Sequence, residues 1–158
     1  MNIAMTPAMN PARTPTARLS SAIAALERLP YSAFAVVARA ATATVFWRSG
    51  TTKISDWDAT LSLFADDYKV PLLPPELAAY MATALELGCS VLIALGLLTR
   101  VSALLLTGMT AVIEIFVYPN AWPTHILWLT AMLPLIARGG GVLSLDHLVW
   151  RFWAQRLG

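Results

Sequence analysis

Charged residues and cysteine are both scarce in this chain. Lys, Arg, Asp and Glu make up 13% of the 158 residues, while 58% of the residues are apolar. Ordinary soluble domains contain about 25% charged residues, so a soluble enzyme is not expected. The single cysteine, Cys89, excludes an intrachain disulfide, a CxxC redox pair and a cysteine-rich metal site. Any redox role must therefore use a bound cofactor or the thiols of a partner.

The sequence also lacks a basic patch and the common nucleotide and metal motifs. Lys and Arg number 11 against 9 Asp and Glu, which gives a net charge of +2 and predicts no nucleic-acid binding. No Walker loop, GxGxxG or HExxH motif is present, and we predict no metal site. The two histidines, His125 and His147, fall on opposite sides of the predicted membrane, so they are not expected to hold a haem together.

Long apolar runs take the place of these features. A hydrocarbon layer about 30 Å thick needs a helix of about 20 residues. Four stretches fit, at about residues 31–48, 77–98, 101–118 and 121–138. Because lipid-embedded backbone must satisfy its own hydrogen bonds, we predict an all-α integral membrane four-helix bundle. Gly50 is expected to end the first of these helices.

The segments around these spans predict a tail and short interfacial amphipathic helices. Residues 1–18 are rich in Pro, Thr and Ala, which predicts a disordered tail before a membrane domain at 19–154. Apolar residues recur at helical spacing between Leu19 and Leu29, which favours a helix on the membrane surface.

Two further interfacial helices are expected after the first and the fourth span. Aromatic and aliphatic residues between Trp57 and Tyr68 recur on one face and predict a helix, capped by Ser55, that roofs the bundle. We call residues 57–68 the roof. After Gly139-Gly140-Gly141, residues 139–158 predict a C-terminal interfacial helix capped by Ser144.

The distribution of Lys and Arg predicts the orientation of the chain in the membrane. Only Arg48, Lys53 and Lys69 flank the spans on the side of the roof. The opposite side, with both termini, carries seven: Arg13, Arg18, Arg28, Arg100, Arg138, Arg151 and Arg156. Because cytoplasmic flanks carry the excess of Lys and Arg, both termini are expected in the cytoplasm.

Four ionisable residues lie within the predicted spans, where an unpaired charge costs at least a few kcal/mol. From their distances to the predicted span ends, Arg39 and Glu86 share the midplane, and we predict a buried ion pair between them. Glu114 and His125 are expected to face each other across a tight turn on the roof side. Each pair has two interpretations, a structural tie or a proton-handling site.

A ligand pocket is predicted at this outer end, beneath the roof. Its candidate residues are Trp47, Arg48, Lys53, Glu114, Tyr118, Trp122 and His125. An apolar cavity with a few polar contacts is the usual form of a small-ligand site. The aromatic members also suit a role as ordinary interface anchors. No catalytic residue can be assigned.

Several motifs resemble the DoxX family of membrane proteins. The segment Phe46-Trp47-Arg48-Ser49-Gly50-Thr51-Thr52-Lys53 resembles the (F/W)xxSGxxK signature that ends the first span in that family. The turn at 95–100 and the segment 141–146 agree with the same pattern, and the likeness covers roughly residues 30–150. On family motif positions lie Arg39, Ser49, Gly50, Lys53, Thr99, Arg100, Ser144 and Asp146.

The resemblance implies a four-span protein of the bacterial inner membrane. DoxX and the related DoxD proteins are associated with quinone-linked sulfur oxidation, and some members with a membrane-bound oxidoreductase assembly. We therefore expect a non-autonomous membrane subunit of a redox or stress-response system, at most part of an oxidoreductase, that binds a quinone or a partner protein.

Two alternatives stay open, and so does the formation of a homo-oligomer. One is a small transporter or permease, with the ionisable residues of the spans lining its path. The other is a membrane scaffold without a ligand.

Overall fold

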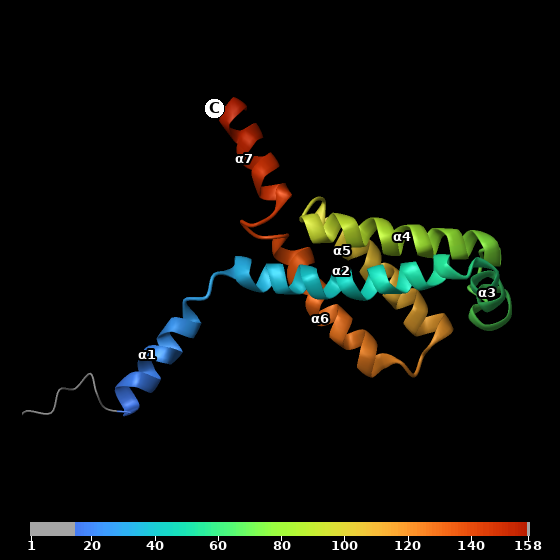
Figure 1. The fold of residues 1–158 in the computed structure, drawn as a ribbon, viewed down its shortest axis with the longest axis horizontal. Helices are drawn as coiled ribbons and strands as arrows, with labels where there is room; N and C mark the ends of the chain where they lie inside the picture. The colour runs from blue at the N-terminus through green and yellow to red at the C-terminus, as the bar shows by residue number, and fades with distance from the viewer. Residues whose placement is uncertain (1–14, 158) are drawn as a thin grey trace, which may run out of the picture. The chain divides into compact units, whose positions relative to one another are not determined.

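The computed structural model describes residues 15–157, which contain helices and no strand (Figure 1). The elements are α1 (Pro15–Glu27), α2 (Tyr31–Ser55), α3 (Trp57–Ser62), η2 (Leu63–Tyr68), α4 (Pro75–Leu95), α5 (Thr99–Val112), η3 (Ile113–Val117), α6 (Trp122–Arg138) and α7 (Leu145–Leu157). Here η2 and η3 are π-helical turns. The predicted all-α class is confirmed.

The chain divides into two units, residues 1–30 and residues 31–158. In the first unit α1 begins at Pro15, earlier than the expected helix start at Leu19. Most of the predicted tail at residues 1–18 lies outside the described residues.

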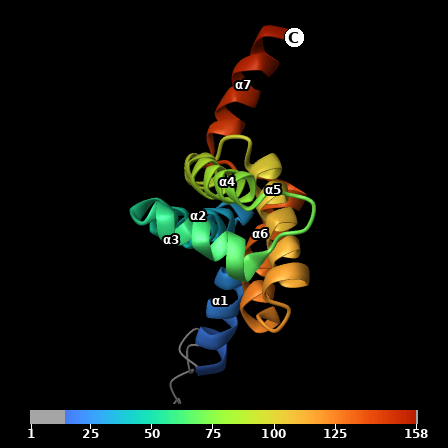
Figure 2. The same cartoon turned by 90° about the vertical axis from the view of Figure 1, so that its right-hand side faces the viewer.

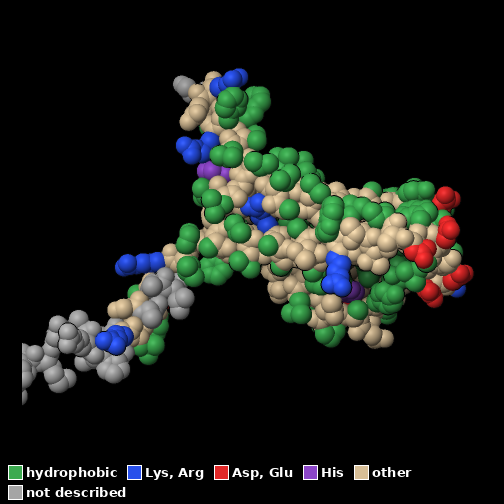
Figure 3. All heavy atoms as spheres, viewed as in Figure 1, with side chains coloured by type: hydrophobic (Ala, Val, Ile, Leu, Met, Phe, Trp, Pro, Cys, Tyr) green, Lys and Arg blue, Asp and Glu red, His purple; other side chains and the backbone are tan. Residues whose placement is uncertain are grey.

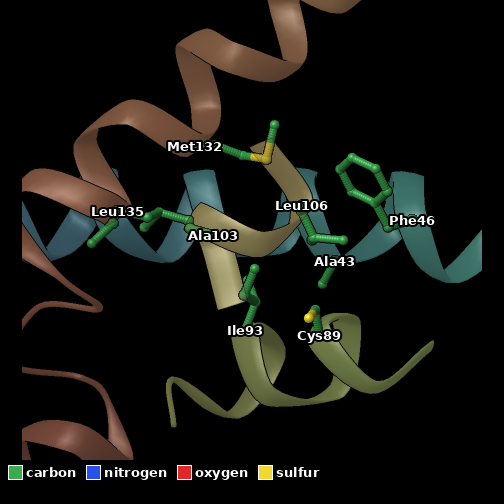
Figure 4. Close-up of a cluster of buried hydrophobic side chains, with 9 residues drawn as sticks. Ala43, Phe46, Cys89, Ile93, Ala103, Leu106, Met132 and Leu135 are labelled. Carbon is green, nitrogen blue, oxygen red and sulfur yellow. The ribbon is translucent and has the colours of Figure 1, made fainter. Parts of the chain in front are cut away.

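The second unit is built around α2, α4, α5 and α6, which lie side by side (Figures 1 and 2). Figure 4 shows side chains from these four helices pointing toward one another. This core consists of Ala35, Ala43, Phe46, Cys89, Ile93, Ala103, Leu106, Met132 and Leu135. Small residues among them let the helix backbones approach closely, which is the packing that helices use in lipid.

The outer surface of this bundle is rich in exposed apolar side chains. Figure 3 shows them spread over the bundle, while Asp and Glu gather at the end that carries the roof. Two helical segments, Pro75–Leu95 and Thr99–Val117, are long and apolar enough to cross a membrane. On the two other helices, Val37 of α2 is 69% exposed and Leu127 of α6 is 66% exposed. Apolar surface of this extent suits contact with lipid.

The helix α2 is longer than the sequence predicts. It continues through Gly50 and ends at Ser55. Gly50 packs against α4, where an added Cβ would come within 2.7 Å of Leu87 Cδ2. The glycine is therefore a point of close approach between helices and not a stop signal.

The roof forms as predicted, from α3 and the π-helical turn η2. Its cap differs, because the side chain of Asp56, and not that of Ser55, accepts a hydrogen bond from the Ala59 backbone N–H at 3.0 Å. Phe64 packs on Ala78 and Ala79 of α4. The roof is thereby held over the first turns of α4.

The helix α7 follows the expected C-terminal pattern. Ser144 Oγ accepts a hydrogen bond from the His147 backbone N–H at 3.3 Å, which confirms the predicted cap. In both views α7 extends crosswise to the long axis of the bundle (Figures 1 and 2). Its aromatic residues are exposed, Trp150 by 73%.

Candidate functional site

A cavity of about 370 Å³ lies at the roof end of the bundle. Its wall is formed by α2, the roof, α4, α5 with η3, and the first half of α6. The lining residues are Val45, Phe46, Ser49, Lys53, Phe64, Tyr68, Val70, Leu73, Ala78, Met81, Ala82, Leu85, Glu86, Met109, Val112, Ile113, Val117, Tyr118, His125 and Trp128. Most of these side chains are apolar, so the few polar ones decide which ligands fit.

The first polar group in the wall is an ion pair between Lys53 and Glu86. Lys53 Nζ donates to the two carboxylate oxygens of Glu86 at 2.8 and 2.9 Å, and the pair has side-chain exposures of 14% and 3%. Ser49 Oγ donates to the same carboxylate at 3.0 Å and accepts from Lys53 Nζ at 3.0 Å. Neither charge is left unpaired, which is the condition for burying both.

This cluster explains the spacing of the SGxxK motif. Ser49 and Lys53 lie one turn apart on α2, so both side chains face α4. Gly50 lies between them and brings the two helices together, because its missing Cβ would stand 3.2 Å from Glu86 Cβ. The motif thus positions a serine and a lysine around a carboxylate of the neighbouring helix.

The second polar group is the pair of His125 and Glu114. His125 Nδ1 is hydrogen-bonded to Glu114 Oε2, as the sequence spacing predicts. Only His125 lines the cavity, and Glu114 lies behind it with 22% of its side chain exposed. A carboxylate at Nδ1 fixes the imidazole tautomer, so Nε2 is the ring nitrogen that a ligand can use.

Two tyrosines contribute hydroxyl groups near the roof. The rings of Tyr68 and Tyr118 lie edge to face with centroids 5.5 Å apart. Burial raises the pKa of Tyr68 above its ordinary value of 10.0, and its hydrogen bond with Tyr118 raises it further. The Tyr68 phenol therefore stays neutral at physiological pH and can donate or accept a hydrogen bond.

The structure brings only part of the predicted pocket together. Lys53, Tyr118 and His125 line the cavity, and Glu114 supports it from behind. Trp47, Arg48 and Trp122 do not line it, and all three are exposed. The face of α2 that reaches the cavity carries Phe46, Ser49 and Lys53, and Trp47 and Arg48 point off this face.

The predicted ion pair between Arg39 and Glu86 is wrong. The Arg39 guanidinium donates to backbone carbonyls instead, to Ile93 at 2.9 Å, Ala94 at 2.6 Å and Leu143 at 2.6 Å. The reason is the length of α2, whose extension to Ser55 places Lys53, and not Arg39, next to Glu86.

Arg39 lies at the end of the bundle opposite to the roof, where it connects the end of α4 with the loop before α7. Gly96 ends α4 at φ +69°, and a Cβ there would stand 2.8 Å from Arg39 Cζ. Asp146 accepts hydrogen bonds from the backbone N–H groups of Leu98 at 2.7 Å and Thr99 at 2.9 Å. These bonds satisfy the free N–H groups at the start of α5. Four positions of the family pattern, those of Arg39, Thr99, Ser144 and Asp146, thus serve helix ends and a turn.

Sequence reasoning missed Ser49 and Glu86 as members of the cavity wall. The spacing of four residues between Ser49 and Lys53 is the signal that could have found them, once α2 is allowed to continue through Gly50. Among the described residues, no group of three or more His, Cys, Asp or Glu could hold a metal ion.

The chain was compared with known protein families, curated proteins and solved structures. Searches of curated proteins and of solved structures find no match. The DoxX family model matches residues 34–119, which is more than half of the chain. The matched segment includes Ser49, Lys53 and Glu86. This protein therefore belongs to the DoxX family, a family of integral membrane proteins.

Proposed function

We propose that this protein is a membrane subunit of a redox or stress-response system whose cavity binds the head group of a quinone. The observation that carries the proposal is the cavity of about 370 Å³, whose mostly apolar wall holds the Lys53–Glu86 ion pair, His125 and two tyrosine hydroxyl groups. Small-ligand sites of about 300–1,000 Å³ with few, well-placed polar contacts are typical of proteins.

The chemistry of the wall suits a flat ring with carbonyl oxygens. The neutral hydroxyl group of Tyr68 is a hydrogen-bond donor for such an oxygen. The three N–H groups of the Lys53 ammonium already donate to Glu86 and Ser49, so Lys53 contributes its positive charge to the wall. The aromatic ring of Trp128 and the Phe46 ring, 5.5 Å from it, offer an apolar surface to the ring of the quinone. Donors at carbonyl oxygens also stabilise the negative charge that develops on them during reduction.

The proposed role is non-autonomous, because electrons must come from or go to a partner oxidoreductase. The chain has a single cysteine, Cys89, which is buried in the core. A dithiol relay within one chain is therefore excluded.

We propose the bacterial inner membrane as the location, with both termini in the cytoplasm. The end of the bundle with the roof carries the acidic residues (Figure 3), while Arg100 and Arg138 lie near the opposite end. Because cytoplasmic flanks carry the excess of Lys and Arg, this distribution supports an outer position for the roof and the cavity.

A binding experiment with a matched pair of variants tests the proposed function. The full-length protein in mild detergent is titrated with a tailless benzoquinone, and quenching of tryptophan fluorescence is measured. Ala82 lines the cavity, so Ala82→Leu should weaken binding at least tenfold. Ala111 on α5 is exposed and outside the cavity, and Ala111→Leu should leave the affinity unchanged.

Two results would contradict the proposal. One is equal affinity in both variants, since the quinone would then bind elsewhere. The other is solute flux by the pure protein in liposomes without quinone binding, which would favour the transporter.

A further inference from the structure

We call the exposed part of the cavity lining its mouth, and this part carries no charged side chain. Its exposed lining residues are Leu73, Met81, Val112 and Tyr118, at 36%, 46%, 39% and 48% exposure. The charged lining residues Lys53 and Glu86 are at most 14% exposed at the side chain. The polar groups therefore lie inside, and the entrance carries no charge.

The position of this mouth is given by the elements that carry it. Met81 lies in the second turn of α4, and Val112 is the last residue of α5 before η3, while Leu73 and Tyr118 lie in the loops just before α4 and just after η3. The segments Pro75–Leu95 and Thr99–Val117 are the two that are apolar and long enough to cross a membrane. An opening between them leads sideways toward hydrocarbon, within the depth of the membrane.

The local geometry of the helices favours an opening there. Immediately after Val112 the helix changes to the π-helical turn η3, in which Ile113 and Val117 face the cavity. Ile115 and Phe116 of the same turn are 65% and 53% exposed and point away from it. Single π-helical turns are rare and occur frequently at functional sites.

We propose that the cavity opens sideways into the bilayer and takes a quinone with an isoprenoid tail. The head group lies inside, near Lys53 and His125, and the tail leaves past Met81 and Val112 into the lipid. This inference rests on the proposed function and deepens it, because it names a membrane-dissolved substrate and its route.

Two quinone probes separate the route from the binding itself. A tailless benzoquinone and the same head group with a long isoprenoid tail are each titrated at equilibrium into the full-length protein in lipid nanodiscs. Met81→Trp narrows the mouth, so the affinity for the tailed quinone should fall at least tenfold more than the affinity for the tailless one. Val112→Trp, on the other side of the mouth, should act in the same way.

A control variant on the same helix completes the design. Val91 of α4 is 44% exposed and outside the cavity, so Val91→Trp should leave both affinities unchanged. If neither mouth variant discriminates between the probes, the sideways route is wrong while the binding site stands. If the tailless quinone fails to bind the unmodified protein, the proposed function itself is wrong. A phospholipid acyl chain retained in the cavity, found by mass spectrometry in place of quinone, would also overturn the inference.

Discussion

Replacing Lys53 by methionine should destabilise the folded protein by about 3–5 kcal/mol, the usual cost of removing one partner of a buried ion pair. The Glu86 side chain is 3% exposed, and Lys53 supplies hydrogen bonds at 2.8 and 2.9 Å to its two oxygens. After the substitution Ser49, at 3.0 Å, is the one side-chain donor left to this carboxylate within residues 15–157. The variant therefore leaves a buried charge without its counter-ion.

Removing both charges should restore most of the lost stability. In Lys53→Met with Glu86→Leu, apolar side chains of similar volume replace the pair, and such replacements are often neutral or stabilising. The stability of the double variant is expected within about 1 kcal/mol of the unmodified protein. The interaction energy from the double-mutant cycle should then reach about 3 kcal/mol, far above the values of independent sites.

The cycle is measured by unfolding in mild detergent with increasing dodecyl sulfate, followed by circular dichroism. Arg48 is the control, since it is an exposed cation on the same end of α2. Arg48→Met should change stability by no more than about 0.5 kcal/mol. Additive losses in the cycle, with the double variant as unstable as the sum of its singles, would refute the reasoning.

Two further predictions concern the opposite end of the bundle and the topology. Arg39→Lys should lose about 2–4 kcal/mol in the same unfolding assay, because an ammonium group cannot match a guanidinium that reaches carbonyls on α4 and on the loop before α7; a loss no larger than that of Arg48→Lys would contradict this. A fluorescent protein fused after Gly158 should be active in the cytoplasm, and alkaline phosphatase inserted within residues 56–69 should be active outside it. The reverse pattern would overturn the proposed orientation.

Much of the fold can be predicted from the sequence, because it depends on local patterns. Apolar runs predict the helices of the bundle, and the spacing of Trp57, Phe64 and Tyr68 predicts the roof. The Gly-Gly-Gly segment and Ser144 correctly locate the start of α7. The tight turn between η3 and α6 also brings Glu114 and His125 together, since few residues separate them.

The cavity wall depends on contacts between distant segments, and there the sequence alone misleads. Gly50 is by its propensity a helix terminator, yet packing against Leu87 keeps it inside α2. Because α2 has extra turns, Lys53 lies next to Glu86, and Arg39 lies near the end of α4, at the opposite end of the bundle.

The helical and apolar character of the chain, and the ionisable groups that its spans must bury, follow from the sequence, because hydropathy and helical periodicity are properties of each segment. Which of these groups pair depends on the packing of the helices in three dimensions. Partners within a bundle are set by where each helix ends and how closely its neighbours approach, and one glycine at a helix contact changed both.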